Sequence, residues 1–300
     1  MNKITFSYTL PVGMSPKDIE RVVPELEYAL GGHVEITNVG KRVDINLYKG
    51  RLLSNIKYEV PDLTGYELGA PIGYSLDKLE IIDMGKDNHT YMLAAGPQGM
   101  GKSTLLNGII NTLLKTYTKD DVQLYLIDLK LGVEFDVYKD SPLTADTCFD
   151  PQDGKLWTIL DDLDFEIRDR MKKFRVAKVK KISEYRKKGN KLPYMLLIID
   201  EYYELKLMEK EIEKKLLQIL MIGRAAGLRC IISSCRPVSD ILSPSVKALM
   251  VDRICFKVAD HVNSEVVLDM PGAEKLPNIK GRCLWLSGAN LTEIQIMNYV

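Results

Sequence analysis

Residues 91–104 read YMLAAGPQGMGKST, and this stretch decides the fold. Its segment Gly96–Ser103 fits the pattern G-x-x-x-x-G-K-[ST]. The apolar run Tyr91–Ala95 predicts a short buried strand before it, and the apolar spacing from Thr104 to Leu114 predicts a helix after it. A strand, a glycine-rich loop and a helix in this order are typical of a nucleotide-phosphate cradle. An ordinary glycine-rich turn is the alternative, which the two flanking elements disfavour.

The residue types of this loop suit phosphate binding. Glycines let successive backbone N–H groups turn toward phosphate oxygens, and the positive end of the following helix dipole points to the same place. Lys102 is expected to reach the β- and γ-phosphates, and the Ser103 hydroxyl is expected to bind Mg²⁺. The predicted nucleotide-binding residues of this segment are Gly96, Pro97, Gln98, Gly99, Met100, Gly101, Lys102, Ser103 and Thr104.

A second site follows the apolar run Met195–Ile199, which predicts a buried strand and ends in the acids Asp200 and Glu201. In P-loop ATPases the first acid of such a pair helps to hold Mg²⁺, and the second orients or deprotonates the attacking water. A strand that ends in solvated acids is the alternative interpretation. Because a phosphate-binding loop lies about a hundred residues upstream, we expect Asp200 to bind the metal and Glu201 to be catalytic.

Composition excludes several classes of protein. The chain has 300 residues, 46% hydrophobic and 27% charged, which suits one large α/β domain with a small appendage and argues against disorder. Lys plus Arg and Asp plus Glu both number 41, so the net charge says nothing about nucleic acid. The five cysteines form no C-x-x-C pair, which argues against a disulfide framework and a structural zinc site. A cytoplasmic location is therefore expected.

The pattern along the chain predicts three parts. Residues 1–55 contain alternating stretches around one helical stretch and predict a small β-α-β-β domain. Residues 56–75 carry several prolines and glycines and are expected to be a connector. Over residues 76–300, strand-like runs alternate with helical ones, which predicts an α/β domain with a mainly parallel sheet. Ligands of such a sheet bind at the carboxyl ends of the strands, where the loop at 96–103 is expected.

Four further segments carry a specific resemblance. They are LYLIDLKLGVEF at 124–135, LLIIDEYYEL at 196–205, GRAAGLRCIISSCRPVSDIL at 223–242 and PGAEKLPNIKGRCLWL at 271–286. Together with the glycine loop they resemble the FtsK/SpoIIIE family of ring-forming DNA-translocating ATPases. The resemblance covers residues 76–288 and extends arguably into the first 75 residues. Within the family, the chain looks most like the short motors of conjugative and other mobile elements.

This resemblance implies a RecA-like P-loop motor domain preceded by a small α/β domain, assembled as a hexamer around duplex DNA and using ATP and Mg²⁺. It implies that Lys102 and Ser103 bind phosphates and Mg²⁺, that Asp200 supports the metal and that Glu201 is the catalytic base. Arg224 falls where the family places its arginine finger, which reaches the nucleotide of the neighbouring subunit. Hydrolysis would then depend on assembly, because another chain supplies the stabilising charge.

The resemblance also points to basic residues that contact DNA from loops lining the ring, namely Lys130, Arg236 and Lys247. Repeated around a pore, they would hold phosphates without reading bases. Three residues depart from the family pattern. Cys235 stands where relatives usually carry a glutamine thought to sense the γ-phosphate, and His261 and Glu265 stand where relatives often carry basic residues. These departures put in doubt the coupling of hydrolysis to movement and the strength of the contact with DNA.

One strongly basic segment, Arg168–Lys191, carries twelve basic residues and two acids. Such a local positive field attracts duplex DNA or an acidic partner. A solvated helix on the outside of the ring is the alternative, which we slightly prefer, because the family places this segment away from the pore loops.

The function predicted from the sequence is an ATP-driven, Mg²⁺-dependent translocase of double-stranded DNA for transfer or partition of mobile DNA. The sequence shows no signal peptide, no membrane-spanning run and none of the membrane anchors or winged helices that relatives often carry. A relaxase, a secretion channel or a membrane-anchoring partner is therefore expected to place the motor. The alternatives are a protein-export ATPase like those of type VII secretion and a nucleotide-switched coupling or adaptor protein. A small-molecule kinase is least favoured.

Overall fold

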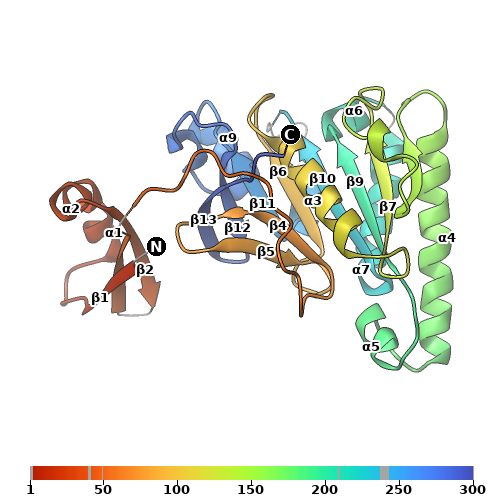
Figure 1. Ribbon diagram of the computed structural model, residues 1–300, viewed down its shortest axis with the longest axis horizontal. Coiled ribbons are helices and arrows are strands. Elements are labelled where there is room, and N and C mark those ends of the chain that lie inside the picture. The colour runs from red at the N-terminus through yellow and green to blue at the C-terminus, as the bar shows by residue number, and fades with distance from the viewer. Residues whose placement is uncertain (1–2, 40–41, 49, 209, 237–242, 300) are drawn as a thin grey trace. The chain divides into compact units, whose positions relative to one another are not determined.

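The computed structural model describes residues 3–39, 42–48, 50–208, 210–236 and 243–299 (Figure 1). The chain divides into two compact units. One consists of Met1–Leu53 with Tyr74–Leu79, and the other of Ser54–Gly73 with Glu80–Val300. Most of the predicted connector belongs to the second unit, where the hydroxyl of Tyr58 lies 3.0 Å from that of Thr112. Whether residues 1–55 fold as a separate domain stays a prediction.

The first unit contains a three-stranded antiparallel sheet in the order β1-β3-β2 with two short helices. The sequence predicts one helix from Ser15 or Pro16 through Leu30, but the structure has two. Pro24, in the first turn of the second helix, has no N–H to donate, so a new helix starts there. The elements are β1 (Lys3–Thr9), α1 (Pro16–Glu20), α2 (Val23–Leu30), β2 (His33–Val39) and β3 (Arg42–Tyr48).

A ten-stranded sheet has the order β5-β4-β13-β12-β11-β6-β10-β9-β7-β8. The run from β11 to β8 is parallel, whereas β11, β12 and β13 pair antiparallel, so the predicted mainly parallel sheet is confirmed. The strands are β4 (Gly69–Tyr74), β5 (Leu79–Asp83), β6 (Tyr91–Ala95), β7 (Val122–Asp128), β8 (Thr144–Cys148), β9 (Tyr194–Asp200), β10 (Leu228–Ser234), β11 (Asp252–Phe256), β12 (Arg282–Ser287) and β13 (Asn290–Gln295).

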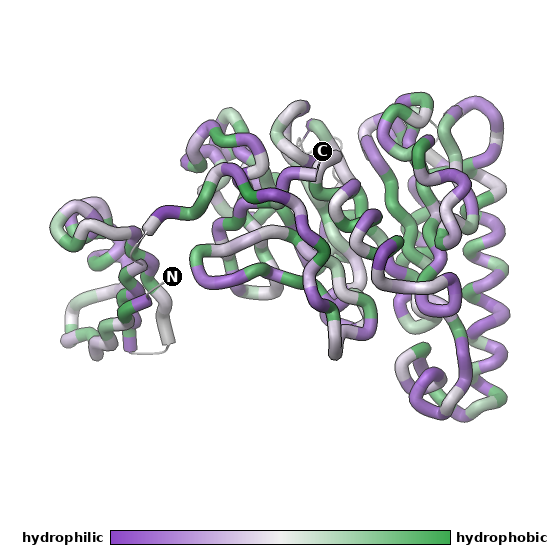
Figure 2. Tube along the Cα trace, in the orientation of Figure 1, coloured by the Kyte–Doolittle hydropathy of each residue, from purple (hydrophilic) through white to green (hydrophobic). Residues whose placement is uncertain are grey.

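Helices cover both faces of this sheet, because its central strands are apolar on both sides. In β9, Leu197 packs in one buried cluster with α4 and α7, and its neighbours Leu196 and Ile198 pack in a second cluster with α3. Figure 2 shows hydrophobic residues along these strands and a mixture of both kinds along α4. Among the described residues, no helix combines the length and hydropathy that crossing a bilayer requires. The helices are α3 (Lys102–Thr116), α4 (Lys155–Val176), α5 (Ile182–Lys187), α6 (Tyr202–Leu207), α7 (Lys210–Ala226), α8 (Pro244–Leu249) and α9 (His261–Leu268), with the 3-10 turns η1 (Asp136–Tyr138) and η2 (Ala273–Lys275).

The register brings the carboxyl ends of the central strands to one edge. Asp128 at the end of β7 pairs with Asp200 at the end of β9, and Ala95 of β6 pairs with Ser234 of β10. The glycine-rich loop leaves β6 at this edge, and α3 begins at Lys102. The residues predicted to bind the nucleotide and the two predicted catalytic-site acids therefore meet at one end of the sheet.

Candidate functional site: a nucleotide-phosphate cradle

The loop after β6 has a backbone that only glycine adopts without strain. Gly96, Gly99 and Gly101 all have positive φ, at 151°, 81° and 117°. A Cβ atom on Gly96 would lie 2.6 Å from the Cβ of Phe256, and one on Gly101 would lie 2.9 Å from the side chain of Ile296. Phe256 and Ile296 therefore pack closely against one side of the loop. The first N–H groups of α3 are available to a phosphate on the other side.

Lys102 curls over this loop. Its Nζ donates hydrogen bonds to the carbonyl oxygens of Gly96, at 2.7 Å, and Pro97, at 3.0 Å. Burial lowers the pKa of Lys102, and the nearby acids Glu201 and Asp200 oppose that shift only in part. A phosphate between the helix N-terminus and this ammonium would receive both charge and hydrogen bonds, so the loop fits the nucleotide that the sequence predicts.

Asp200 is the last residue of β9 and is almost completely buried. Its Oδ1 accepts a hydrogen bond from the Ser233 hydroxyl at 2.5 Å. Burial raises the pKa of Asp200 above its ordinary value, although this hydrogen bond opposes the shift. A buried carboxyl group close to the Lys102 loop suits a cation bound with the phosphates, because a nearby positive charge favours the charged form of the carboxyl group.

Glu201 follows in a left-handed conformation, with φ 62° and ψ 70°. This turn brings its carboxylate back against the ends of β7 and β10. Lys130 Nζ donates to Oε2 at 2.8 Å, and the backbone N–H of Cys235 donates to Oε1 at 3.1 Å. Burial alone would raise the pKa of Glu201, but the hydrogen bonds from Cys235 and Lys130 outweigh it and hold the pKa below its ordinary value. The predicted base is therefore an ionised, buried carboxylate.

Asp128 also lies at this site, although it is not among the site residues predicted from the sequence. It is completely buried, and its Oδ2 accepts the backbone N–H groups of Glu134 at 2.7 Å and Phe135 at 3.2 Å. Its Oδ1 accepts the N–H of Lys130 at 3.1 Å. The signal was present, because Asp128 ends an apolar strand just as Asp200 does. Its hydrogen bonds hold the base of the loop that carries Lys130.

Arg224 lies in the last turn of α7, away from this edge. Its Nη2 donates to the backbone oxygen of Asp87 at 2.5 Å, and the side chain is exposed. Arg224 precedes β10, whereas the nucleotide loop lies beside the end of β10 at Ser234. A strand of seven residues separates the two by about 20 Å, so Arg224 does not reach the nucleotide loop of its own chain.

The three residues predicted to contact DNA lie in different surroundings. Lys130 is part of the cradle itself, as described above. Arg236 is exposed and stacks on Tyr203, with its guanidinium 4.6 Å from the ring centre, and residues 237–242 of the same motif lie outside the described part. Lys247 is 22% exposed and paired with Asp269 at 2.6 Å. The structure thus gathers two of the three near Glu201 and gives the third a partner on the end of α9.

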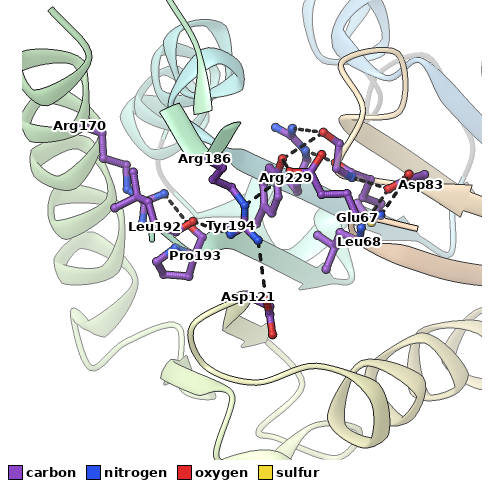
Figure 3. Close-up of polar contacts among 12 residues, drawn as sticks. Glu67, Leu68, Asp83, Asp121, Arg170, Arg186, Leu192, Pro193, Tyr194 and Arg229 are labelled. Carbon is purple, nitrogen blue, oxygen red and sulfur yellow. Dashed lines mark hydrogen bonds and ion pairs between the residues drawn. The ribbon is translucent and has the colours of Figure 1, made fainter. Parts of the chain in front are cut away.

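His261 and Glu265, which depart from the family pattern, are exposed on α9. The basic segment Arg168–Lys191 is only partly a surface feature. Arg170 is buried and donates to the carbonyl oxygens of Pro193 and Ala226 at 2.6 and 3.1 Å, and Arg186 donates to that of Leu192 at 2.8 Å (Figure 3). Several of its charges therefore bind the chain itself, which leaves fewer for an external partner.

The fold and this site define a P-loop nucleotide-binding protein with a RecA-like sheet. The chain belongs to the FtsK/SpoIIIE family, because the model of that family matches residues 71–238, more than half of the chain. The predicted resemblance is thereby confirmed, and with it the class of P-loop ATPase.

Two relatives that match the chain are much longer than the matched region. It is 34% identical over 214 residues to the DNA translocase SpoIIIE of Bacillus subtilis, covering 67% of this chain and 27% of that protein. It is 31% identical over 239 residues to the DNA translocase FtsK of Clostridium tetani, covering 73% of this chain and 31% of that protein. The chain therefore spans less than a third of the length of these relatives.

Solved structures match more of the chain. The pCW3 conjugation coupling protein TcpA, in its monomer form with ATPγS, superposes with a TM-score of 0.75 at 26% identity, covering 99% of this chain and 85% of TcpA. The cytoplasmic domain of the type VII secretion ATPase EccC from Thermomonospora curvata superposes with a TM-score of 0.71 at 21% identity, covering 80% of this chain and 30% of that one. The second likeness shows the shared fold alone.

Proposed function

We propose that this chain is an ATP-driven translocase of double-stranded DNA that serves transfer or partition of mobile DNA. The observation that carries the proposal is the match to TcpA, a conjugation coupling protein, over 99% of this chain and 85% of that one. The relatives named DNA translocases support the same substrate. The intact cradle, with Lys102, Asp200 and Glu201 in place, supports turnover rather than a passive nucleotide switch.

In this proposal each residue of the cradle has a separate part. The loop N–H groups and Lys102 bind the phosphates, and Ser103 with Asp200 would hold Mg²⁺, which when bound supplies positive charge to the β- and γ-phosphates. Glu201 accepts the proton of the attacking water, because its carboxylate lies at this edge and hydrogen bonds hold its pKa below the ordinary value. Exclusion of bulk water by the buried strand ends strengthens these interactions.

The motor is proposed to act as a hexamer around DNA. Arg224 is exposed and lies about a strand length from its own nucleotide loop, which suits an arginine that serves the neighbouring subunit. Lys130, Arg236 and Lys247 are proposed to hold DNA phosphates without reading bases. A cytoplasmic location and a relaxase, secretion channel or membrane anchor as partner remain proposals of the same kind.

The test is ATP hydrolysis measured against protein concentration, with and without long linear duplex DNA. We expect a steep dependence on concentration and stimulation by duplex in the wild type. Arg224→Ala should lose roughly a thousandfold in rate, because it removes the charge supplied in trans. Arg42→Ala is the matched control, since Arg42 is an exposed arginine of the first unit paired with Asp44.

Two outcomes would overturn the proposal. Activity that is flat with concentration and indifferent to duplex would favour a protein-export motor. Nucleotide binding without turnover, combined with retention of a protein partner, would favour an adaptor that uses nucleotide as a switch.

A further inference from the structure

Both carboxylate oxygens of Glu201 already have hydrogen-bond donors. Lys130 Nζ lies 2.8 Å from Oε2, and the Cys235 N–H lies 3.1 Å from Oε1. A general base must place an oxygen within hydrogen-bond reach of the water that it deprotonates. Cys235 donates through its backbone N–H, and a hydrogen bond with its side chain also lowers the pKa of Glu201. Lys130 instead donates from a long, flexible side chain that is able to leave.

The two partners of this ion pair differ in their freedom to move. The side chain of Glu201 is 2% exposed, and its backbone N–H donates to the Ser233 hydroxyl at 3.2 Å. The side chain of Lys130 is 41% exposed. Any rearrangement that separates the pair therefore moves the lysine into solvent and leaves the glutamate in the cradle.

Lys130 also belongs to a loop that is tied at its base and exposed at its tip. Asp128 binds three backbone N–H groups of the loop, including that of Lys130 itself. The next residue, Leu131, has a φ of 62°, unusual for a branched side chain, and is 75% exposed, and Val133 is 78% exposed. The tip thus presents apolar side chains and a strained residue to the surroundings, next to the lysine that holds the catalytic carboxylate.

The same loop is linked to the helix that carries the nucleotide site. The hydroxyl of Tyr138, at the end of η1, donates to the Asn107 side chain at 2.6 Å, and Asn107 donates to the backbone oxygen of Ser103 at 2.9 Å. These hydrogen bonds hold the end of the loop against the start of α3, so the exposed side chain of Lys130 is the part of the loop that is free to respond.

We propose that Lys130 is a positioning residue that keeps Glu201 occupied until the phosphates of duplex DNA draw its ammonium group away. The inference rests on the proposed function and deepens it, because it makes one lysine both the restraint on the base and the sensor of the polyanion. DNA attracts lysines through its phosphates whatever its sequence. The release of Lys130 frees Oε2 of Glu201 for water, and hydrolysis then follows DNA binding.

The experiment compares Lys130→Met, Lys130→Arg and wild type in steady-state ATP hydrolysis, with and without long linear duplex DNA, and in duplex binding by fluorescence anisotropy. We expect Lys130→Met to raise the DNA-free kcat by about fivefold or more, the low end of couplings between two sites, with little change in KM. Duplex should then give no further stimulation. Lys130→Arg keeps a cation for Glu201 and should restore a low DNA-free rate and a response to duplex.

The control is Lys139→Met, because Lys139 is an exposed lysine just after η1 paired with Asp136 rather than with a cradle residue. Its DNA-free and stimulated rates should match the wild type. Thermal unfolding checks that each variant is folded, and Lys130→Gln replaces Lys130→Met if the methionine variant does not fold.

The outcomes separate this inference from the proposed function. A DNA-free rate that is unchanged while duplex affinity falls would make Lys130 a phosphate contact only, and a rate that falls with and without DNA would make it part of the chemistry. Either result overturns the inference and leaves the translocase proposal standing. If the wild type shows no stimulation by duplex, the proposed function itself fails.

Discussion

The two ends of the central strands both bury charged side chains, but they satisfy them in different ways. At the carboxyl ends, Lys102, Asp200 and Glu201 meet around the glycine loop. At the amino ends, Arg170 and Arg229 are as deeply buried. Figure 3 shows the polar contacts around these two arginines. Because burying an ion without partners is costly, each end must be held together by a specific set of contacts.

At the amino ends the partners are mostly backbone carbonyl groups, which cannot leave. Arg229 donates to the carbonyl oxygens of Met84, Gly85, Arg224 and Leu228, and its guanidinium lies 4.7 Å from the ring centre of Tyr194. These bonds join the end of α7 to the segment after β5. These bonds stabilise the fold at the amino ends of the strands, and we call this set of contacts around Arg170 and Arg229 the lock.

At the carboxyl ends of the strands, phosphates could replace the hydrogen-bond partners of the charged side chains, and we call this end of the sheet the exchangeable end. The ammonium groups of Lys102 and Lys130 bind loop carbonyls and a carboxylate, and both cations could transfer to phosphates. The backbone there also adopts left-handed conformations at Gly96, Gly101 and Glu201. The difference indicates that a buried charge serves a ligand where a phosphate or water could replace its partners, and serves the fold where several backbone carbonyl groups away from the nucleotide loop hold it.

The largest effect should come from the exchangeable end. Glu201→Gln should lower the rate of ATP hydrolysis by roughly a thousandfold, because the amide cannot accept the proton of the attacking water. Nucleotide affinity, measured by titration calorimetry, should stay close to wild type, since Lys102 and the loop are unchanged. Glu211→Gln, an exposed glutamate of α7, is the control. A Glu201→Gln enzyme that keeps a tenth of its activity would remove Glu201 as the base.

A substitution in the lock should lower the stability of the fold and leave nucleotide binding unchanged. Arg229→Met should lower the free energy of unfolding by about 3 kcal/mol, because several buried carbonyl groups lose their donor at once. Thermal unfolding measures this loss, and the exposed Arg168→Met should change the stability by less than about 0.5 kcal/mol. Nucleotide affinity should persist below the melting temperature. If affinity were lost in a folded variant, the two ends would not be separate in function.

The sequence predicts the residues of the exchangeable end well, because phosphate binding requires particular residue types at neighbouring positions in the chain. A phosphate cradle needs glycines at positive φ followed by a lysine, and these residues are contiguous at 96–102. The buried strand that ends in Asp200 and Glu201 has an equally local signature. The fold class and the family follow from these segments together.

The sequence does not predict the partners of the charges. Lys130 is predicted to contact DNA, and only the register of β7 against β9 brings it to Glu201. Arg170 and Arg186 lie in a segment that looks like a solvated basic helix, although they bind backbone oxygens of residues 192, 193 and 226. Most of these contacts join positions far apart in the chain, and a count of charges carries no information about burial.

A smaller effect tests whether the lock depends on the hydroxyl group of Tyr194. The Tyr194 hydroxyl donates to Glu67 at 2.8 Å and lies 3.1 Å from the backbone oxygen of Gly85. Tyr194→Phe keeps the ring against Arg229 and removes only the hydroxyl, so the stability should fall by about 1 kcal/mol. Denaturation of this variant, of Arg229→Met and of the double variant measures their coupling, which should exceed about 0.5 kcal/mol for residues in contact. Strict additivity would show that Tyr194 and Arg229 act independently.

The smallest effect concerns Glu213, whose carboxylate accepts hydrogen bonds from neighbouring side chains close to the exchangeable end. Burial alone would raise the pKa of Glu213, but hydrogen bonds from Lys206, Tyr202 and Ser243 hold that pKa below its ordinary value. The pKa is lower in the folded state, so the stabilisation is present above the unfolded pKa of about 4.3 and is lost as the pH falls through the folded pKa.

Glu213→Gln should therefore flatten the fall in melting temperature between about pH 5 and pH 3, where the unfolded carboxyl takes up its proton first. At pH 7 it should cost at most about 0.5 kcal/mol, because solvent screens these partly exposed groups. Melting temperatures of wild type and variant across this range give the measurement, with Glu211→Gln as the matched change on the same helix. Parallel curves would mean that Glu213 contributes no pH-dependent stability, and that Tyr202, next to Glu201, is held by packing rather than by charge.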